Sequence, residues 1–168
     1  MLFLLLIKMR TLYVALGSNK GNRTVLLKRA IDSLSRTVGT LLKCSSFYET
    51  SPVGFKSKHF FINAVAAFST DLSTTELLEK TQEIERELGR THKSIDHHYK
   101  DRCIDIDLLM LDDVILSTDV LTLPHPEMHR RTFVLEPFAE IAPMTIHPLL
   151  KRTIKELAKQ FQEEEVIK

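Results

Sequence analysis

The sequence has few cysteines, no excess of one charge and no long hydrophobic run, and each absence excludes a class of protein. Its two cysteines, Cys44 and Cys103, fit no CxxC or CxxH spacing, so neither a disulfide framework nor a structural zinc site is expected. There are 23 basic residues against 22 acidic ones, which provides no overall field for a nucleic-acid backbone or an anionic membrane. We therefore expect reduced thiols, no nucleic-acid partner and no membrane partner.

The most hydrophobic segment lies at the N-terminus. Residues 1–7 are apolar, but the run stops at Lys8, far short of the roughly 20 residues that span a bilayer. Basic residues follow this run, whereas in a secretory signal peptide they precede it. We interpret residues 1–10 as an N-terminal extension or the start of the first strand, and residues 11–168 as a single domain of a cytoplasmic, monomeric protein.

Hydrophobic periodicity predicts elements in the order strand, helix, strand, strand, helix, strand. The expected strands cover residues 11–16, 41–48, 60–69 and 103–111, and the expected helices cover 23–38 and 74–88. A short return strand over 114–116 and helices over 132–141 and 153–161 follow. The order is that of an α+β fold with a ferredoxin-like split βαβ antiparallel sheet, helices packed on one face and extra C-terminal helices.

Residues 17–22 contain two glycines and two asparagines and predict a loop between the first strand and the first helix. This segment lacks the Gly-Lys-Ser/Thr ending of a P-loop and the spacing of GxGxxG. On its residues alone it is a strand-to-helix turn.

Two aspartates alternate with apolar residues near the middle of the chain. In a strand, Asp105 and Asp107 share one face while Ile104, Ile106 and Leu108 share the other. Their Cα atoms should lie about 6.6 Å apart, so both carboxylates can ligate one Mg²⁺ or bridge two ions. The pair is a candidate metal site.

The alternative is that both aspartates simply form the solvent face of an edge strand. Local pattern does not separate the two interpretations. Aspartate is depleted in strands, however, and two carboxylates on one face repel unless a cation offsets them, which favours the metal site.

Basic residues precede this pair in a polar stretch that predicts an exposed loop. They could neutralise a bound triphosphate, or they could be ordinary solvated surface. His125, between two prolines, could present its imidazole to phosphate oxygens together with Arg131, or it could be a structural hydrogen-bonding residue. The basic residues of the loop are Arg90, Lys93, Lys100 and Arg102.

Several spaced motifs, in order from Thr11 to Ile146, resemble the 6-hydroxymethyl-7,8-dihydropterin pyrophosphokinase family. They are Ala15-Leu16-Gly17-Ser18-Asn19, Ser46-Phe47-Tyr48, Thr50-Ser51-Pro52, Phe61-Ile62-Asn63-Ala64, Gln82 with Glu85, Gly89-Arg90, Arg102-Cys103-Ile104-Asp105-Ile106-Asp107, Pro124-His125 and Arg131-Thr132-Phe133. The resemblance implies an α+β enzyme of folate synthesis in which ATP and the pterin meet over two Mg²⁺ ions. The pterin hydroxymethyl oxygen then attacks the β-phosphorus, and AMP leaves.

The resemblance also implies roles for individual residues. Asp105 and Asp107 would be the metal ligands and, with Arg90 and Arg102, the catalytic residues. Asn63 would bind the hydrogen-bonding edge of the pterin while Phe133 stacks on its face, and the pocket would also contain Thr50, Pro52, Val53, Phe61 and Tyr99. The ATP site would contain Gln82, Glu85, Arg90, His92, Arg102, Leu108, Thr122, His125 and Arg131.

The chain departs from the family pattern before the metal strand. Members commonly have Trp-Gly-Pro-Arg there, whereas this chain has Tyr99-Lys100-Asp101-Arg102, and a second arginine two positions after Arg90 is replaced by His92. The segment from Arg90 to Arg102 is nevertheless the candidate lid over ATP. The rival interpretations are a ferredoxin-like binding or regulatory domain, and another Mg²⁺- and ATP-dependent transferase on the same fold.

Overall fold

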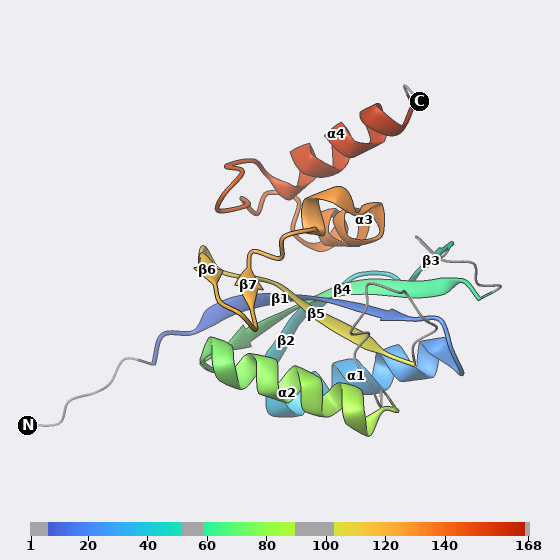
Figure 1. Ribbon diagram of the computed structural model, residues 1–168, viewed down its shortest axis with the longest axis vertical. Helices are drawn as coiled ribbons and strands as arrows, with labels where there is room; N and C mark the ends of the chain where they lie inside the picture. Colours follow the sequence, from blue (N-terminus) through green and yellow to red (C-terminus); the bar gives the residue numbers. More distant parts are fainter. Residues whose placement is uncertain (1–6, 52–58, 90–102, 167–168) are drawn as a thin grey trace, which may run out of the picture.

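The structure is a computed structural model that describes residues 7–51, 59–89 and 103–166. Within them, helices lie on both sides of an antiparallel sheet (Figure 1). The fold is thus of the mixed α/β type.

The central sheet carries the two aspartates and Asn63 on its strands. Its main strands lie in the order β2-β4-β1-β5, and β3 also pairs with β4. Strand β1 therefore has β4 on one side and β5 on the other, and both pairings are antiparallel. The bounds are β1 Arg10–Ser18, β2 Thr40–Cys44, β3 Tyr48–Thr50, β4 Phe61–Thr70 and β5 Asp105–Leu111.

Helices α1 (Arg23–Thr37) and α2 (Thr74–Glu87) cover one face of this sheet (Figure 1). Both begin at a residue whose side chain accepts from the first helical turn: Asn22 caps α1, and Ser73 forms a capping box with Glu76 in α2. Apolar residues at helical spacing pack against alternate residues of the strands, so one core fills the space between them.

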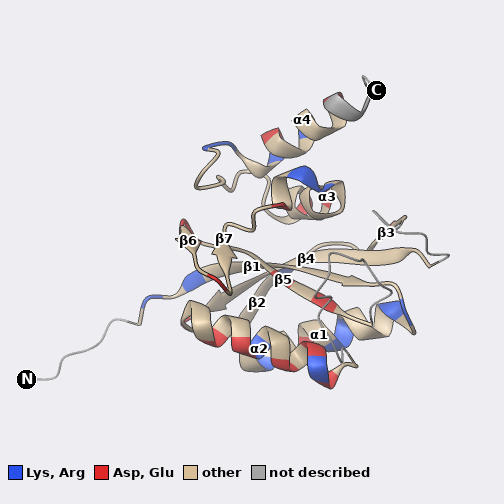
Figure 2. Cartoon of the chain, in the orientation of Figure 1, with Lys and Arg blue, Asp and Glu red and all other residues tan. Residues whose placement is uncertain are grey.

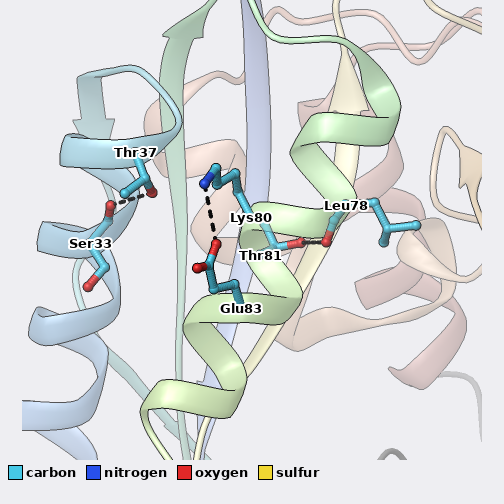
Figure 3. A network of polar contacts seen from close by, with 6 residues as sticks. All are labelled: Ser33, Thr37, Leu78, Lys80, Thr81 and Glu83. Carbon is cyan, nitrogen blue, oxygen red and sulfur yellow. Dashed lines mark hydrogen bonds and ion pairs between the residues drawn. The ribbon is translucent and has the colours of Figure 1, made fainter.

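Figure 3 shows α1 and α2 side by side. The hydroxyl of Thr81, which is 2% exposed, donates to the Leu78 carbonyl at 3.0 Å, so a polar group enters the core side of α2 with its hydrogen bond satisfied. Lys80 and Glu83 form an ion pair of 3.3 Å on the exposed side of the same helix. Residues of both charges occur along α2, whereas most of the sheet is uncharged (Figure 2).

The opposite face of the sheet is covered by the C-terminal part of the chain. Helices α3 (Thr132–Ile141) and α4 (Ile154–Val166) lie above it in Figure 1, and the short 3-10 helix η1 (Met128–Arg130) precedes α3. A second apolar cluster, which includes Val65, Met110 and Phe138, fills this side. The C-terminal helices that the sequence predicts are thus confirmed, and they form a separate layer.

Three details of the secondary structure differ from the sequence prediction. The strand expected over 41–48 is split into β2 and β3, because the side chain of Ser45 accepts from the Val65 amide at 3.0 Å and interrupts the ladder. Gly17 and Ser18, expected in a loop, continue β1. The expected return strand instead forms a small separate sheet, in which β6 (Leu116–Ser117) pairs with β7 (Thr122–Leu123).

None of the helices in the described segments is long and apolar enough to cross a bilayer.

Candidate active site

The two aspartates of β5 lie on the face of the sheet away from α1 and α2. Ile106 and Leu108, 5% and 4% exposed, belong to the core under those helices, whereas Asp105 and Asp107 are half-buried on the other side. The shared face predicted from the strand period of two is confirmed.

Strand pairing places Asn63 on the same face as these aspartates. Gly17 on the central strand is the Cα partner of Asn63 on β4 and of Asp105 on β5. Residues paired directly across antiparallel strands point to the same face. Because neighbouring strands lie about 4.8 Å apart, the Cα atoms of Asn63 and Asp105 are separated by roughly 10 Å across the glycine.

The residues around Asn63 form a small polar and aromatic group at the start of β4. Asn63 is 6% exposed, and its side-chain nitrogen donates to the Thr50 hydroxyl at 2.6 Å. Phe61 is the Cα partner of Thr50 and adds a half-buried aromatic ring. Phe133, near the start of α3, packs against the core on this face of the sheet, and the Arg131 guanidinium lies 5.8 Å from the centre of its ring.

A pocket of about 270 Å³ lies between α2, β5 and the β6–β7 hairpin. Five residues from the predicted ATP and metal sites line it: Gln82, Asp107, Leu108, Thr122 and His125. The pocket therefore brings together residues from three separate parts of the chain, and one of the two aspartates opens into it.

Glu85, also predicted for the ATP site, is not among the residues that line this pocket. It is 3% exposed, and its carboxylate accepts a hydrogen bond of 2.8 Å from the backbone amide of Ile106, the residue between the two aspartates. Glu85 thus holds the strand that carries both aspartates.

His125 is held in a neutral form by its surroundings. Burial, and next the positive charge of Arg131, lower the pKa of its imidazole to about 4, although Glu127 and Asp105 act in the opposite direction. Its Nδ1 accepts from the Glu127 amide at 3.1 Å, so the proton of the neutral ring is assigned to Nε2. At neutral pH His125 can donate one hydrogen bond to an anion but adds no charge.

The chemistry of the carboxylate pair fits Mg²⁺. Within the described residues, no group of three or more histidines, cysteines and acidic residues could hold a metal ion. Mg²⁺ usually binds one or two carboxylates and completes its shell with substrate phosphates and water, so two half-buried aspartates beside a pocket suffice.

Known proteins resemble this chain over most of its length. The family described as 7,8-dihydro-6-hydroxymethylpterin-pyrophosphokinase (HPPK) matches residues 13–143. The 2-amino-4-hydroxy-6-hydroxymethyldihydropteridine pyrophosphokinase of Porphyromonas gingivalis is 49% identical over 142 residues, which cover 83% of this chain and 95% of that protein. The protein of the same name from Haemophilus influenzae is 38% identical over 161 residues, 95% of this chain and 98% of its own length.

The chain belongs to the HPPK family.

Solved structures show the same fold at much lower identity. The crystal structure of Plasmodium falciparum HPPK-DHPS, wild type, with STZ-DHP superposes with a TM-score of 0.71 over 93% of this chain, at 16% identity. This chain spans only 42% of that longer chain. The likeness supports the HPPK-type fold of the described residues.

The structure places only part of the predicted HPPK site. Thr50, Phe61, Asn63 and Phe133 lie on two strands and a helix, and the pocket that Asp107 lines adds the ATP-site residues named above. The predicted positions outside the described residues are Pro52, Val53, Arg90, His92, Tyr99 and Arg102. The roles of all the predicted site residues, inside and outside the described segments, stay predictions.

Other lining residues of the pocket were not predicted as site residues. Leu78 and Thr81 line it from α2, and residues 118–121 line it from the turn between β6 and β7. Leu78 lies one helical turn before Gln82 and two before Glu85, so the spacing could have indicated a shared helix face. The turn has no comparable signal in the sequence.

Glu140 of α3 is a structural residue of the site that the sequence interpretation missed. Its carboxylate accepts from the Ser46 amide at 3.0 Å, the Ser46 hydroxyl at 2.7 Å and the Tyr48 hydroxyl at 2.5 Å. The contact ties α3, which carries Phe133, to β3, which carries Thr50. Ser46 and Tyr48 belong to a recognised motif, but their acidic partner lies far away in sequence and only the fold identifies it.

Replacing Glu140 by glutamine should remove a pH-dependent contribution to stability. The hydrogen bond from Tyr48 lowers the pKa of Glu140. The ionised Glu140 carboxylate therefore stabilises the fold above about pH 4.5, and this stabilisation is lost as the pH falls through the lowered pKa. The same bond raises the pKa of Tyr48 to about 12. The stabilisation provided by the protonated Tyr48 hydroxyl is therefore complete below about pH 10 and is lost as the pH rises through 12. Melting temperatures of the wild type and Glu140→Gln should differ most between these limits.

Ultraviolet titration of the tyrosines gives a second measurement. In Glu140→Gln the pKa of Tyr48 should move down toward its ordinary value of about 10. Glu163→Gln, which changes an exposed residue of α4, is the matched control and should alter neither the titration nor the melting curves. An unchanged Tyr48 titration in Glu140→Gln would contradict the assigned contact.

Proposed function

We propose that the chain transfers pyrophosphate from ATP to the hydroxymethyl group of 6-hydroxymethyl-7,8-dihydropterin and releases AMP, as a step of folate biosynthesis. The observation that carries the proposal is the row formed by Asn63, Gly17 and Asp105. It sets a buried amide, suited to a pterin, and a metal-binding carboxylate on one face about 10 Å apart. The pocket beside Asp107 has space next to this row for part of a nucleotide.

The pterin is bound at the start of β4. The Asn63 amide provides a donor and an acceptor for the polar edge of the ring, next to Thr50. Phe61 and Phe133 supply aromatic surfaces for the two faces of the ring, as flat heterocycles require. Pro52, Val53 and Tyr99 complete the pocket in this proposal.

ATP is bound along β5 and the pocket beside it. Gln82, Leu108 and Thr122 contact the nucleoside, while neutral His125 donates a hydrogen bond to a phosphate oxygen. Arg90, Arg102 and Arg131, with His92, supply the donors that balance charge on the phosphates as it shifts in the transition state. Phosphoryl transfer depends mostly on such positioning and electrostatic stabilisation.

Asp105 and Asp107 hold Mg²⁺, and we propose two ions. When bound, the metal neutralises phosphate charge and lowers the cost of bringing the alcohol oxygen to the β-phosphorus. The role of the two aspartates is to place the positive charge of the metal where the two substrates meet.

Other features of the whole chain stay predictions. They are the ferredoxin-like classification of the sheet, residues 11–168 as one pyrophosphokinase domain, the monomeric state, the cytoplasmic location and a lid over residues 90–102. The observed strand order and the helices between the strands support the first of these.

The decisive assay is product identification. Incubation with ATP, Mg²⁺ and 6-hydroxymethyl-7,8-dihydropterin should release AMP and a diphosphorylated pterin in equal amounts, as measured by chromatography. Reactions without the pterin are the control and should release no AMP. ADP, free phosphate or no turnover would refute the proposal and favour one of the rival interpretations.

A further inference from the structure

Gly17 occupies the middle position of the row between the two proposed substrate sites. It lies in the middle strand, with Asn63 on one side and Asp105 on the other. The glycines with positive φ in the described residues are Gly21 and Gly89, so the backbone conformation of Gly17 does not itself call for glycine. Another reason must explain why no side chain stands there.

The surrounding side chains supply that reason. A Cβ atom at position 17 would lie 2.9 Å from the side-chain oxygen of Asn63 and 3.8 Å from the Phe61 ring. The first distance is shorter than real Cβ contacts allow, and the atom that would have to move belongs to the amide itself.

The Asn63 amide has little freedom to move. It is 6% exposed, and its nitrogen is held by the Thr50 hydroxyl at 2.6 Å while its oxygen lies beside Gly17. A rotation that relieves the clash at the oxygen also displaces the nitrogen and distorts the bond to Thr50. The empty position at Gly17 therefore fixes the direction in which Asn63 presents its hydrogen-bonding groups.

We propose that Gly17 is a positioning residue of the pterin site, which acts through Asn63. Its bare Cα lets the Asn63 amide lie flat against the sheet in the orientation that matches the pterin edge. It also leaves open the space of about 10 Å between Asn63 and Asp105, which the bicyclic ring and its short hydroxymethyl arm together would span. The inference rests on the proposed function, because that function identifies the ligand that Asn63 binds.

The first test is the binding of the two substrates to Gly17→Ala. We expect the dissociation constant of 6-hydroxymethyl-7,8-dihydropterin, measured by calorimetry with a non-reacting ATP analogue present, to rise about tenfold or more. The dissociation constant of the ATP analogue with Mg²⁺ should stay within about twofold, because Gly17 does not line the pocket beside Asp107. Pterin affinity equal to that of the wild type would overturn the proposal.

A double-mutant cycle tests whether Gly17 acts through Asn63. Asn63→Ala removes the atom that the new Cβ would meet, so adding Gly17→Ala to it should weaken pterin binding by less than about twofold further. If Gly17→Ala alone folds poorly, the double variant should regain the melting temperature of Asn63→Ala. Full additivity, or a double variant that folds no better, would show that the clash lies elsewhere.

A readout without substrate separates this inference from the proposed function. The side-chain amide of Asn63 should give a slowly exchanging NMR signal in the wild type and a shifted, faster exchanging one in Gly17→Ala, since its bond to Thr50 is distorted. A wild-type protein that binds no pterin and releases no AMP would refute the function alone. An unchanged amide signal in Gly17→Ala would refute the role of Gly17 alone.

Discussion

Asp105→Ala and Asp107→Ala should each lower turnover by about a thousandfold or more while the protein stays folded. Each change deletes one of the two carboxylates that hold the metal at the junction of the substrates, and the proposed reaction depends above all on stabilising phosphate charge there. Ile106 and Leu108, which anchor β5 in the core, are retained, so the melting temperature should change little.

The corresponding asparagine variants test whether turnover requires the charge of each aspartate or only the size of its side chain. Asp107→Asn keeps the size of the side chain but removes the charge and one of the two acceptor oxygens, so it should also lose turnover. Asp113→Ala, an exposed aspartate just beyond the same strand, is the matched control and should keep wild-type turnover. Mn²⁺ binding in the presence of an ATP analogue measures the metal site directly. Near-normal activity or metal affinity in either alanine variant would exclude that aspartate as a ligand.

Glu85→Ala should combine a loss of stability with a loss of turnover. Removing the carboxylate leaves the buried amide of Ile106 without its 2.8 Å partner, which costs about 1–3 kcal/mol of unfolding free energy. The same amide lies between Asp105 and Asp107, so β5 should lose its fixed position at the edge of the sheet. Because small displacements of catalytic groups are costly, we expect turnover to fall about 10- to 100-fold.

Two further variants show whether Glu85 acts through this bond. Glu85→Gln keeps an oxygen that can accept from Ile106, so it should recover most of the stability. Glu83→Ala, which breaks an exposed pair with Lys80 on the same helix, should cost no more than about 1 kcal/mol and leave turnover unchanged (Figure 3). Denaturant unfolding and the Mg²⁺ dependence of turnover are the measurements. A Glu85→Gln variant as unstable as Glu85→Ala would contradict the assigned contact.

Local sequence patterns predicted the elements whose formation depends on neighbouring residues. Apolar residues at helical spacing predicted α1 and α2, and both helices begin directly after a residue that caps them, Asn22 and Ser73. The shared face of Asp105 and Asp107 followed from the strand period alone, since alternation holds in any strand. The ordered motifs also identified the family, because they span most of the chain.

Long-range contacts were the part that no local pattern could predict. The strand expected over 41–48 is split because Ser45 forms a hydrogen bond with Val65. Glu140 in turn accepts hydrogen bonds from Ser46 and Tyr48. The residues after β5 pair with a later strand and form one wall of the pocket. Each of these outcomes depends on residues that are distant in sequence.

By itself, the sequence determined the family, the main helices and strands, and the sharing of one face of β5 by its two aspartates. Only the tertiary structure decided that Asn63, Gly17 and Asp105 form one row, and that Glu85 holds the strand from behind. The physical reason is that alternation along a strand is local, whereas the register between strands and the contact of a helix with a strand are set by packing of the whole core.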